Sequence, residues 1–550
     1  ARAAAGGADT LRAAGADSVR PGAPPPATRV DFERLDRRIL ALPLPVRDYG
    51  TLVAGPPGTL FVGERVPNQP GLTLHRWDMA KRKADVYVTG AARVSASGDG
   101  RKLLWQSGDA WTVADAAGQP KPGEGRLALA LRAPLDPARE WRQIWQEAWR
   151  MERDFFYDPG LHGADWAAVR RRYEPLVAHV RHRADLTYLL DQLGGELAVG
   201  HSFVGGGDLP AVDTVRVGLL GADLAVEQGR WRIRRILTSE SWNPGLRAPL
   251  DAPGVRARAG DYLLAVDGQP VSADVELGRA LDGTADGQTV LRLATRPDGA
   301  DAWTVTVVPV RSDAQLRQRA WVEDNRRRVD SLSGGRLAYV WVPNTSTGAV
   351  TSFDRYYFAQ QDRRGAVIDE RFNGGGLLDD YMVGIMGRKL VGGLTTDVPG
   401  AAPLTLPVGG IHGPKVLLVN EMAGSGGDYF PWVFKTLGVG PLVGTRTWGG
   451  LVAAAVPYPL VDGGTITAPS QAVYDARSQW IAEGVGVPPD IEVWQEPKLV
   501  AQGRDPQLER AVAEALRLLE TQGVTPPPAP AFVRKARRPS AAGRASDGGR

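Results

Sequence analysis

The sequence predicts a multidomain protein that joins an antiparallel β part, a helical part, a small β-rich domain and an α/β domain with a mainly parallel sheet. At 550 residues the chain is too long for one ordinary hydrophobic core. Short β-like runs separated by turn residues fill about 30–130, whereas apolar strands that run into glycines and then helices fill about 335–495. The expected parts are a flexible lead-in (1–29), the antiparallel β part (30–130), the helical part (131–210), the β-rich domain (211–320), the α/β domain (321–523) and a disordered basic tail (524–550).

The antiparallel β part has the pattern of a propeller blade. Residues 95–116, SASGDGRKLLWQSGDAWTVADA, alternate turn, strand, tight turn and strand, and they end in an Asp. Two blades cannot close a ring. We therefore expect only the end of a β-propeller here, and we expect the chain to be part of a longer protein.

The helical part is predicted from its start signal and its tryptophans. Asp136 and Pro137 have the residue types of an N-cap and a first helical position. Further helices are expected at about 165–182 and 185–195, and the second leads into the loop that carries His201. Tryptophans recur every four residues along the first helix, which predicts a buried face: Trp141, Trp145 and Trp149.

The β-rich domain resembles a PDZ domain in two phrases. Residues 254–271, GVRARAGDYLLAVDGQPV, place a strand between a Gly-Asp turn and an Asp-Gly turn. The second phrase is VGLLGADLAV at 217–226. PDZ domains bind extended peptides by adding a strand to a sheet edge, so we expect weak binding of peptide ends.

The α/β domain is predicted to carry a site at one edge of its sheet. One apolar strand, 366–368, precedes the run Gly374–Gly376, and another, 415–419, precedes the glycines around Ser425. Ligand sites of such sheets lie at the carboxyl ends of the parallel strands. Both glycine runs are therefore expected at the same edge.

Composition excludes several functions. The 66 Lys and Arg nearly balance the 62 Asp and Glu, and the basic excess lies in the tail, so no nucleic-acid partner is expected. The absence of Cys excludes disulfides, Cys-ligated zinc and a thiol nucleophile. No apolar run is long enough to span a membrane. His179 and His182 lack a Glu at zinc-site spacing, and we expect no metal and no cofactor.

Ser425 is the candidate nucleophile. It lies between glycines at a strand-to-helix junction, where the following N–H groups and the helix dipole can stabilise an oxyanion. The run AGSGG lacks the spacing of a G-x-S-x-G nucleophile elbow, so a simple helix cap is an equally good local interpretation. The second glycine run favours catalysis because it lets backbone approach a ligand closely. Among the six His, His201 is the best candidate base by elimination, although a structural His is the commoner case.

Seven motifs in one order give a family resemblance. They are DFFYDPGLHGADW, GELAVGHSF, the PDZ-like phrase, RFNGGG, NEMAGSGGDYF, GTRTWGG and EGVGVPPDIEV. Over about 30–520 the chain resembles the C-terminal half of the tricorn proteases, self-compartmentalising serine peptidases that trim peptides released by the proteasome or its counterparts. The resemblance implies the end of a second β-propeller, a helical part, a PDZ domain and an α/β domain of the tail-specific-protease or crotonase-like type. It also implies peptide substrates, a homo-hexamer and a cytoplasmic location.

The resemblance assigns roles to individual residues. It implies that Ser425 is the nucleophile, His201 the general base and Glu483 the acid that helps to hold the His. The implied oxyanion donors are the backbone N–H groups of Gly426 and of Gly376, with Gly375 as the alternative to Gly376. The acid nearest to the family's specificity position is Asp397, which would select basic side chains.

The chain departs from the family at Gly200. The family often has a Ser there, whose hydroxyl links the His to the acid, and a water or Ser202 could bridge the gap. We therefore expect Glu483→Gln to lose less activity than Ser425→Ala or His201→Ala. We also expect Gly200→Ser to raise kcat. The residue after the nucleophile is often Asp and is Gly426 here, which leaves the backbone N–H in place.

Three other functions fit parts of the sequence. A tail-specific protease would use a Ser–Lys dyad, but the position of its Lys is Gly450, and Lys435 lies inside a predicted helix. A non-catalytic peptide-binding scaffold of PDZ and propeller parts predicts no labelling of Ser425. Acyl-CoA chemistry on a similar sheet predicts a CoA site and leaves the PDZ-like domain unexplained.

Overall fold

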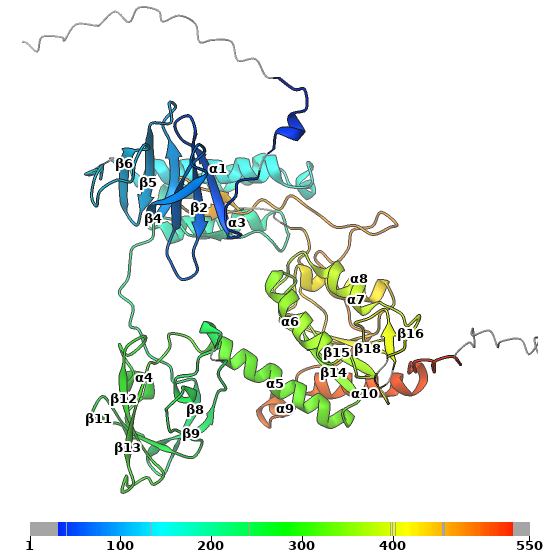
Figure 1. Ribbon diagram of the computed structural model, residues 1–550. Helices are drawn as coiled ribbons and strands as arrows, with labels where there is room; N and C mark the ends of the chain where they lie inside the picture. Colours follow the sequence, from blue (N-terminus) through cyan, green and yellow to red (C-terminus); the bar gives the residue numbers. More distant parts are fainter. Residues whose placement is uncertain are drawn as a thin grey trace, which may run out of the picture. The chain divides into compact units, whose positions relative to one another are not determined.

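The computed structural model describes residues 31–39, 41–132, 134–240, 242–396, 398, 400–401, 403–453 and 457–531. The chain divides into two compact units, Ala1–Pro134 and Leu135–Arg550 (Figure 1). The predicted lead-in, 1–29, lies outside the described residues, as does the predicted tail from 532 onward.

The N-terminal unit is an antiparallel sheet whose six strands follow one another in chain order (Figure 1). Its longest strand, β4, pairs with β3 through its first half and with β5 through its second half, with register shifts in both pairings. Phe61, Tyr87 and Trp105 meet edge to face in the core, with ring centroids 5.1 and 5.9 Å apart. This arrangement agrees with the predicted partial propeller. The strands are β1 (Tyr49–Ala54), β2 (Thr59–Arg65), β3 (Leu72–Asp78), β4 (Lys83–Ala96), β5 (Lys102–Ser107) and β6 (Ala110–Asp115).

The second unit begins with the helical part. Asp136 caps α1 (Pro137–Phe155) by accepting bonds from the N–H groups of Ala138 and Arg139, and Trp145 on α1 is fully buried. The helix predicted at 165–182 is shorter than expected: α2 (Trp166–Tyr173) is followed by a 3-10 turn, Glu174–His179, that has a Pro near its start. The third helix is α3 (Arg183–Gly195).

A segment from far along the sequence completes the helical part. β7 (Val204–Gly205) pairs with β21 (Thr465–Ile466), and β21 pairs with β20 (Tyr458–Pro459). Leu460 and Ile466 join the core of the helices. Arg183 and Asp462 form a fully buried ion pair beside this sheet. A segment that lies within the predicted α/β domain in the sequence therefore packs with the helical part.

The β-rich domain is a sheet of order β13-β12-β10-β9-β8, with β11 paired to β10. Asp267 and Gly268, both with positive φ, form the predicted turn between β10 and β11. β8 lies at the sheet edge, and a cavity of about 280 Å³ lies between it and α4. The elements are β8 (Ala222–Glu227), β9 (Arg230–Ile236), β10 (Tyr262–Val266), β11 (Gln269–Pro270), α4 (Leu277–Ala280), β12 (Thr289–Ala294) and β13 (Trp303–Val307).

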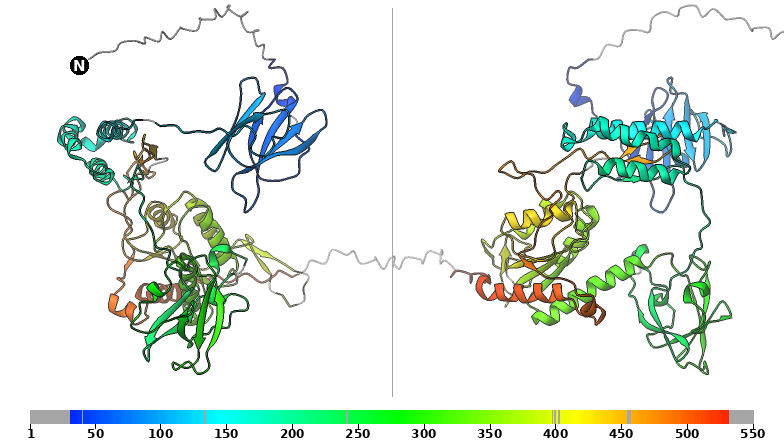
Figure 2. Two further views of the ribbon diagram at one scale, coloured as in Figure 1. Left: turned by 90° about the vertical axis from the view of Figure 1, so that its left-hand side faces the viewer. Right: turned by 180° about the vertical axis from the view of Figure 1, so that it is seen from behind.

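The α/β domain has a five-stranded parallel sheet of order β14-β15-β18-β19-β22. Helices α5 and α10 cover one face, and α6, α7 and α8 lie on the other (Figures 1 and 2). β14, β15 and β18 are buried throughout, as expected for strands covered on both faces. The helices are α5 (Ala314–Ser333), α6 (Thr347–Phe358), α7 (Asp379–Met386), α8 (Gly426–Thr436), α9 (Pro497–Ala501) and α10 (Pro506–Gln522). The strands are β14 (Leu337–Trp341), β15 (Gly365–Asp369), β18 (Lys415–Val419), β19 (Leu442–Gly444) and β22 (Ile491–Glu492), with a separate hairpin of β16 (Gly392–Leu394) and β17 (Leu404–Leu406).

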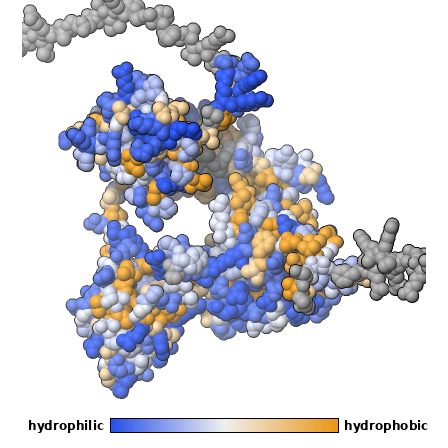
Figure 3. All heavy atoms as spheres, in the orientation of Figure 1, coloured by the Kyte–Doolittle hydropathy of each residue, from blue (hydrophilic) through white to orange (hydrophobic). Residues whose placement is uncertain are grey.

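The described helices give no candidate for a membrane span, because none combines the necessary length with a sufficiently apolar composition. The face drawn in Figure 3 carries hydrophilic side chains, with apolar side chains interspersed among them.

Candidate active site

Ser425 lies at a strained backbone position between β18 and α8. It is the N-cap of α8 and has φ 60° and ψ −116°, which is unusual for a residue with a Cβ. Its N–H group donates to the carbonyl of Gly450 (3.1 Å) and to Oδ2 of Asp428 (3.0 Å). Strain of this kind persists only where surrounding contacts hold it, and it is concentrated at functional sites.

The glycine loop 374–376 lies directly against Ser425. A Cβ on Gly375 would lie 2.6 Å from the Cβ of Ser425, and one on Gly426 would lie 2.8 Å from the N of Gly376. Only glycines allow this approach. The N–H of Gly375 donates to Oδ1 of Asn373 (2.9 Å). Among the described residues the N–H groups of Gly376 and Gly426 donate no hydrogen bond, which leaves both free for a ligand.

Asp428 connects Ser425 to the loop after β19. This fully buried carboxyl accepts bonds from the N–H groups of Ser425, Gly449 (2.8 Å) and Gly450 (3.0 Å) and from the hydroxyl of Thr447. Burial raises the pKa of Asp428, and these four donors oppose that rise. Asp428 is not among the site residues expected from the sequence. An acid three residues after a helix N-cap was the available signal.

Glu483 holds two loops together through backbone groups. Its Oε1 accepts from the N–H of Gly200 (2.8 Å), and its Oε2 accepts from those of Leu451 (2.6 Å) and Val452 (2.5 Å). Gly200 precedes His201, and Leu451 follows the Gly450 that binds Ser425. The carboxylate therefore joins the loop of His201 to the loop that contacts Ser425.

His201 lies beside the Trp448 ring, with ring centroids 5.5 Å apart. Its Nδ1 is buried and has no hydrogen-bond partner among the described residues. The residues 447–452 thus contact both candidates: Ser425 through Gly450, and His201 through Trp448. Hydrogen bonds between catalytic groups often tighten only when substrate binds.

The burial of His201 predicts a pH–activity profile that is shifted toward acid pH. Burial lowers the pKa of His201 below its ordinary value of 6.5, and the carboxylates of Glu483 and Asp428 offset part of this effect. The imidazole therefore stays neutral, and able to accept a proton, to lower pH than usual. We expect the acid limb of a kcat/KM profile to have its midpoint below 6.5 and to move lower still in Glu483→Gln. A midpoint at or above 6.5 would contradict this.

The structure reverses the expectation for Gly200→Ser. A Cβ on Gly200 would lie 2.8 Å from the Cα of Gly450 and 2.9 Å from the ring of Trp448. A side chain there must displace backbone or an aromatic ring, so we expect Gly200→Ser to lower both kcat and Tm. Gly195→Ser is the matched control, because nothing lies within 4 Å of its Cβ position. An increase in kcat for Gly200→Ser would overturn this prediction.

Ser202 does not bridge the gap beside Gly200. Its hydroxyl lies 1.8 Å from where a Cβ on Gly194 would be, against α3, and it has no hydrogen-bond partner among the described residues. Asp397, the predicted specificity residue, lies outside the described residues.

The described lysines near the sheet have other partners. Lys435 on α8 forms an ion pair with Asp490 (2.5 Å). Lys415 is buried at the start of β18, where its Nζ donates to the carbonyl of Gly413 (3.0 Å). These contacts do not favour a Ser–Lys dyad.

Other histidines have structural roles. His162 bonds the hydroxyl of Tyr157 (2.6 Å) and the carbonyl of Leu197 (2.9 Å). His182 is exposed, and its side chain accepts from the N–H of Ala184 as the N-cap of α3. Among the residues that the structure describes, no cluster of three His, Asp or Glu could hold a metal ion.

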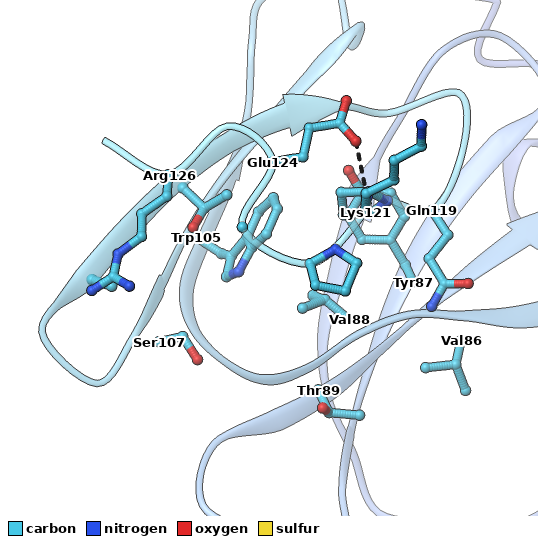
Figure 4. A pocket seen from close by; sticks show the side chains of 15 residues that line it. Val86, Tyr87, Val88, Thr89, Trp105, Ser107, Gln119, Lys121, Glu124 and Arg126 are labelled. Carbon is cyan, nitrogen blue, oxygen red and sulfur yellow. Dashed lines mark hydrogen bonds between the residues drawn. The ribbon is translucent and has the colours of Figure 1, made fainter. Parts of the chain in front are cut away.

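A cavity of about 510 Å³ lies in the N-terminal unit (Figure 4). Tyr87 and Trp105 line it, and Glu124 accepts from the N–H of Lys121 (2.9 Å). The hydroxyl of Ser107 donates to the carbonyl of Gly90 (2.9 Å), and no His lines the cavity. This cavity therefore offers no pairing of a nucleophile with a base.

Comparison with known protein families identifies three domains. Residues 137–195 match the tricorn protease C1 domain, residues 218–312 match the tricorn protease PDZ domain and residues 336–493 match peptidase family S41. The predicted PDZ-like and peptidase domains are thereby confirmed.

Similar proteins extend the match over most of the chain. Tricorn protease homolog 1 of Streptomyces coelicolor is 38% identical over 92% of this chain and 49% of its own length. Tricorn protease of Thermoplasma volcanium is 28% identical over 89% of this chain and 48% of its own length. A crystal structure of the tricorn protease superposes with a TM-score of 0.78 at 26% identity, covering 86% of this chain and 46% of that one.

The chain spans about half the length of the curated relatives it matches. Within that half, the C1, PDZ and S41 matches follow one another in the predicted order. The chain therefore carries the C1, PDZ and S41 peptidase domains of the tricorn protease family.

Proposed function

We propose that this chain is the catalytic part of a tricorn-type serine peptidase that hydrolyses peptides. Ser425 attacks the scissile carbonyl, His201 takes its proton and returns it to the leaving amine, and Glu483 positions the loop of His201. The N–H groups of Gly426 and Gly376 stabilise the oxyanion. Gly376 is preferred to Gly375 because the N–H of Gly375 already donates to Asn373.

One observation carries the proposal. The strained Ser425 lies where two free N–H groups, those of Gly426 and Gly376, come close together at the N-terminus of a helix. A serine that merely caps a helix requires neither the strain nor the second glycine loop. Two free N–H donors at this position can stabilise the oxyanion of a tetrahedral intermediate.

Labelling with a fluorophosphonate tests the proposal. The probe phosphonylates an activated serine, and mass-spectrometric mapping of the adduct should find Ser425. A peptide-binding scaffold or an acyl-CoA enzyme predicts no adduct there. Absence of labelling in a folded protein that also fails to hydrolyse fluorogenic peptides would refute the proposal.

The remaining parts of the proposal rest on the family resemblance. They are a homo-hexamer, a cytoplasmic location, peptide substrates presented by the PDZ domain, and selection of basic side chains by Asp397. Light scattering measures the first. Cleavage of peptide libraries by the wild type and by Asp397→Asn measures the last.

A further inference from the structure

The turn between β15 and the glycine loop contains a buried carboxyl that the proposed mechanism does not use. Glu370 is fully buried, and its Oε2 accepts from Nδ2 of Asn373 (3.0 Å). Its Oε1 has no partner among the described residues. Burying a carboxyl without partners for both oxygens costs folding free energy, so its position beside this loop suggests a function.

Asn373 links Glu370 to both catalytic loops. Its Oδ1 accepts from the N–H of Gly375 (2.9 Å), and its backbone carbonyl accepts from the N–H of Gly424 (3.1 Å), next to Ser425. An N–H can only donate, so the oxygen of the Asn373 amide must face Gly375. The amide nitrogen must then face Glu370, whose carboxyl holds the amide in this orientation.

Hydrogen bonds on both sides of Gly375 orient the peptide group that carries the N–H of Gly376. The carbonyl of Gly375 accepts from the N–H of Thr345 (2.9 Å), and the N–H of Gly375 is held by Asn373. Gly375 and Gly376 have φ of 82° and 148°, so their backbone has wide conformational freedom. Without the bond to Asn373 this peptide group would be held only at its carbonyl, by Thr345, and would rotate more freely.

We infer that Glu370 is a positioning residue for the oxyanion donor, acting through Asn373 on the peptide group of Gly376. This inference rests on the proposed function and adds a residue to it. Among the described residues the side chain of Glu370 hydrogen-bonds to Asn373 and not to Ser425. Its effect is to keep the Gly376 N–H aimed where negative charge develops.

The protonation state of Glu370 suits this role. Burial raises its pKa well above the ordinary value, and Asp379 on α7, Asp428 on α8 and Asp369 on β15 raise it further, while the bond from Asn373 lowers it. Burial and these neighbouring carboxyls therefore favour the neutral form of Glu370. It accepts from Asn373 on Oε2, and a Gln of the same shape can do the same.

Single substitutions give the first test. Glu370→Gln keeps the acceptor, and we expect its kcat to stay within about threefold of the wild type. Glu370→Leu leaves Nδ2 of Asn373 unpaired, and we expect kcat and the rate of fluorophosphonate labelling to fall about 10- to 100-fold, with KM for short peptides nearly unchanged. Lys415→Met is the matched control: it removes a buried polar group at the opposite end of the same sheet, and it should lower Tm without lowering kcat.

A polarity exchange gives the second test. In Glu370→Gln with Asn373→Asp, the new carboxylate accepts from the Gly375 N–H with one oxygen and from the amide introduced at position 370 with the other. We expect this double variant to be at least tenfold more active than Glu370→Leu with Asn373→Asp. Rescue by reversing donor and acceptor is not expected of a side chain that only fills space.

The outcomes separate the inference from the proposed function. Failure of the wild type to label at Ser425 refutes both. A wild type that labels, with a folded Glu370→Leu that labels at the same rate, refutes only the role of Glu370. Equal activity of the two double variants refutes it as well, and this arm holds even where Glu370→Leu alone fails to fold.

Discussion

Ser425→Ala is expected to abolish fluorophosphonate labelling and nearly all peptide hydrolysis, and His201→Ala should reduce kcat by roughly 10²–10⁴. In the proposed mechanism the Ser425 hydroxyl forms the acyl-enzyme and the His201 imidazole takes its proton, so each variant lacks a group that the reaction needs. KM for short peptides should change little, because neither side chain contributes much to binding the ground state. Steady-state kinetics with fluorogenic peptides measures both effects.

Two exposed residues of the same types provide matched controls. Ser331→Ala on α5 and His179→Ala in the 3-10 turn after α2 should leave kcat unchanged. Circular dichroism and Tm confirm that each variant is folded. If a folded His201→Ala remained active, the base would be another group, and a lysine-dependent mechanism would have to be reconsidered.

Glu483→Gln is expected to reduce kcat by about 10²-fold and to lower Tm by several degrees. A carboxylate accepts from Gly200 on one oxygen and from Leu451 and Val452 on the other. A Gln offers one oxygen, so either orientation of its amide turns an NH₂ group toward a backbone donor. A buried donor left unpaired costs about 1–3 kcal/mol. The sequence predicts a smaller loss than for Ser425→Ala or His201→Ala, because Gly200 has no hydroxyl to link Glu483 to the His. In the structure the carboxylate instead accepts hydrogen bonds from backbone N–H groups, including that of Gly200.

Glu492→Gln, at an exposed position on β22, is the control for loss of a carboxylate. It should change neither kcat nor Tm. A Glu483→Gln variant with wild-type kcat would show that the bonds between the two loops do not matter for catalysis.

Those parts of the fold that depend only on a few neighbouring residues could be predicted from the sequence. Asp136 and Pro137 begin α1 as expected, because a cap needs only the next three residues. The Asp267-Gly268 turn could be predicted because few residues other than Gly, Asn and Asp adopt positive φ at low cost. The two glycine runs follow β15 and β18 as expected, since buried parallel strands are continuous apolar runs.

The roles of buried polar groups could not be predicted in this way. Asp428 and Glu370 occupy positions where an acid would ordinarily be solvated, and only packing shows that both are fully buried beside the catalytic loops. The cost of a side chain at Gly200 depends on the ring of Trp448, which belongs to a distant part of the sequence. The residues next to Gly200 in the sequence do not predict that contact.

The sequence by itself determined the order of domains and the candidates Ser425 and His201, because motifs and periodicity are properties of neighbouring residues. It pointed to Glu483 only through the family resemblance. Only the tertiary structure decided which groups meet. The bond from Gly200 to Glu483 spans 283 residues, and the pairing of β7 with β21 brings a segment of the α/β domain into the helical part. Such contacts form because the free energy gained by burying the whole core offsets the entropic cost of closing long loops. Both quantities depend on the complete fold and not on any local segment.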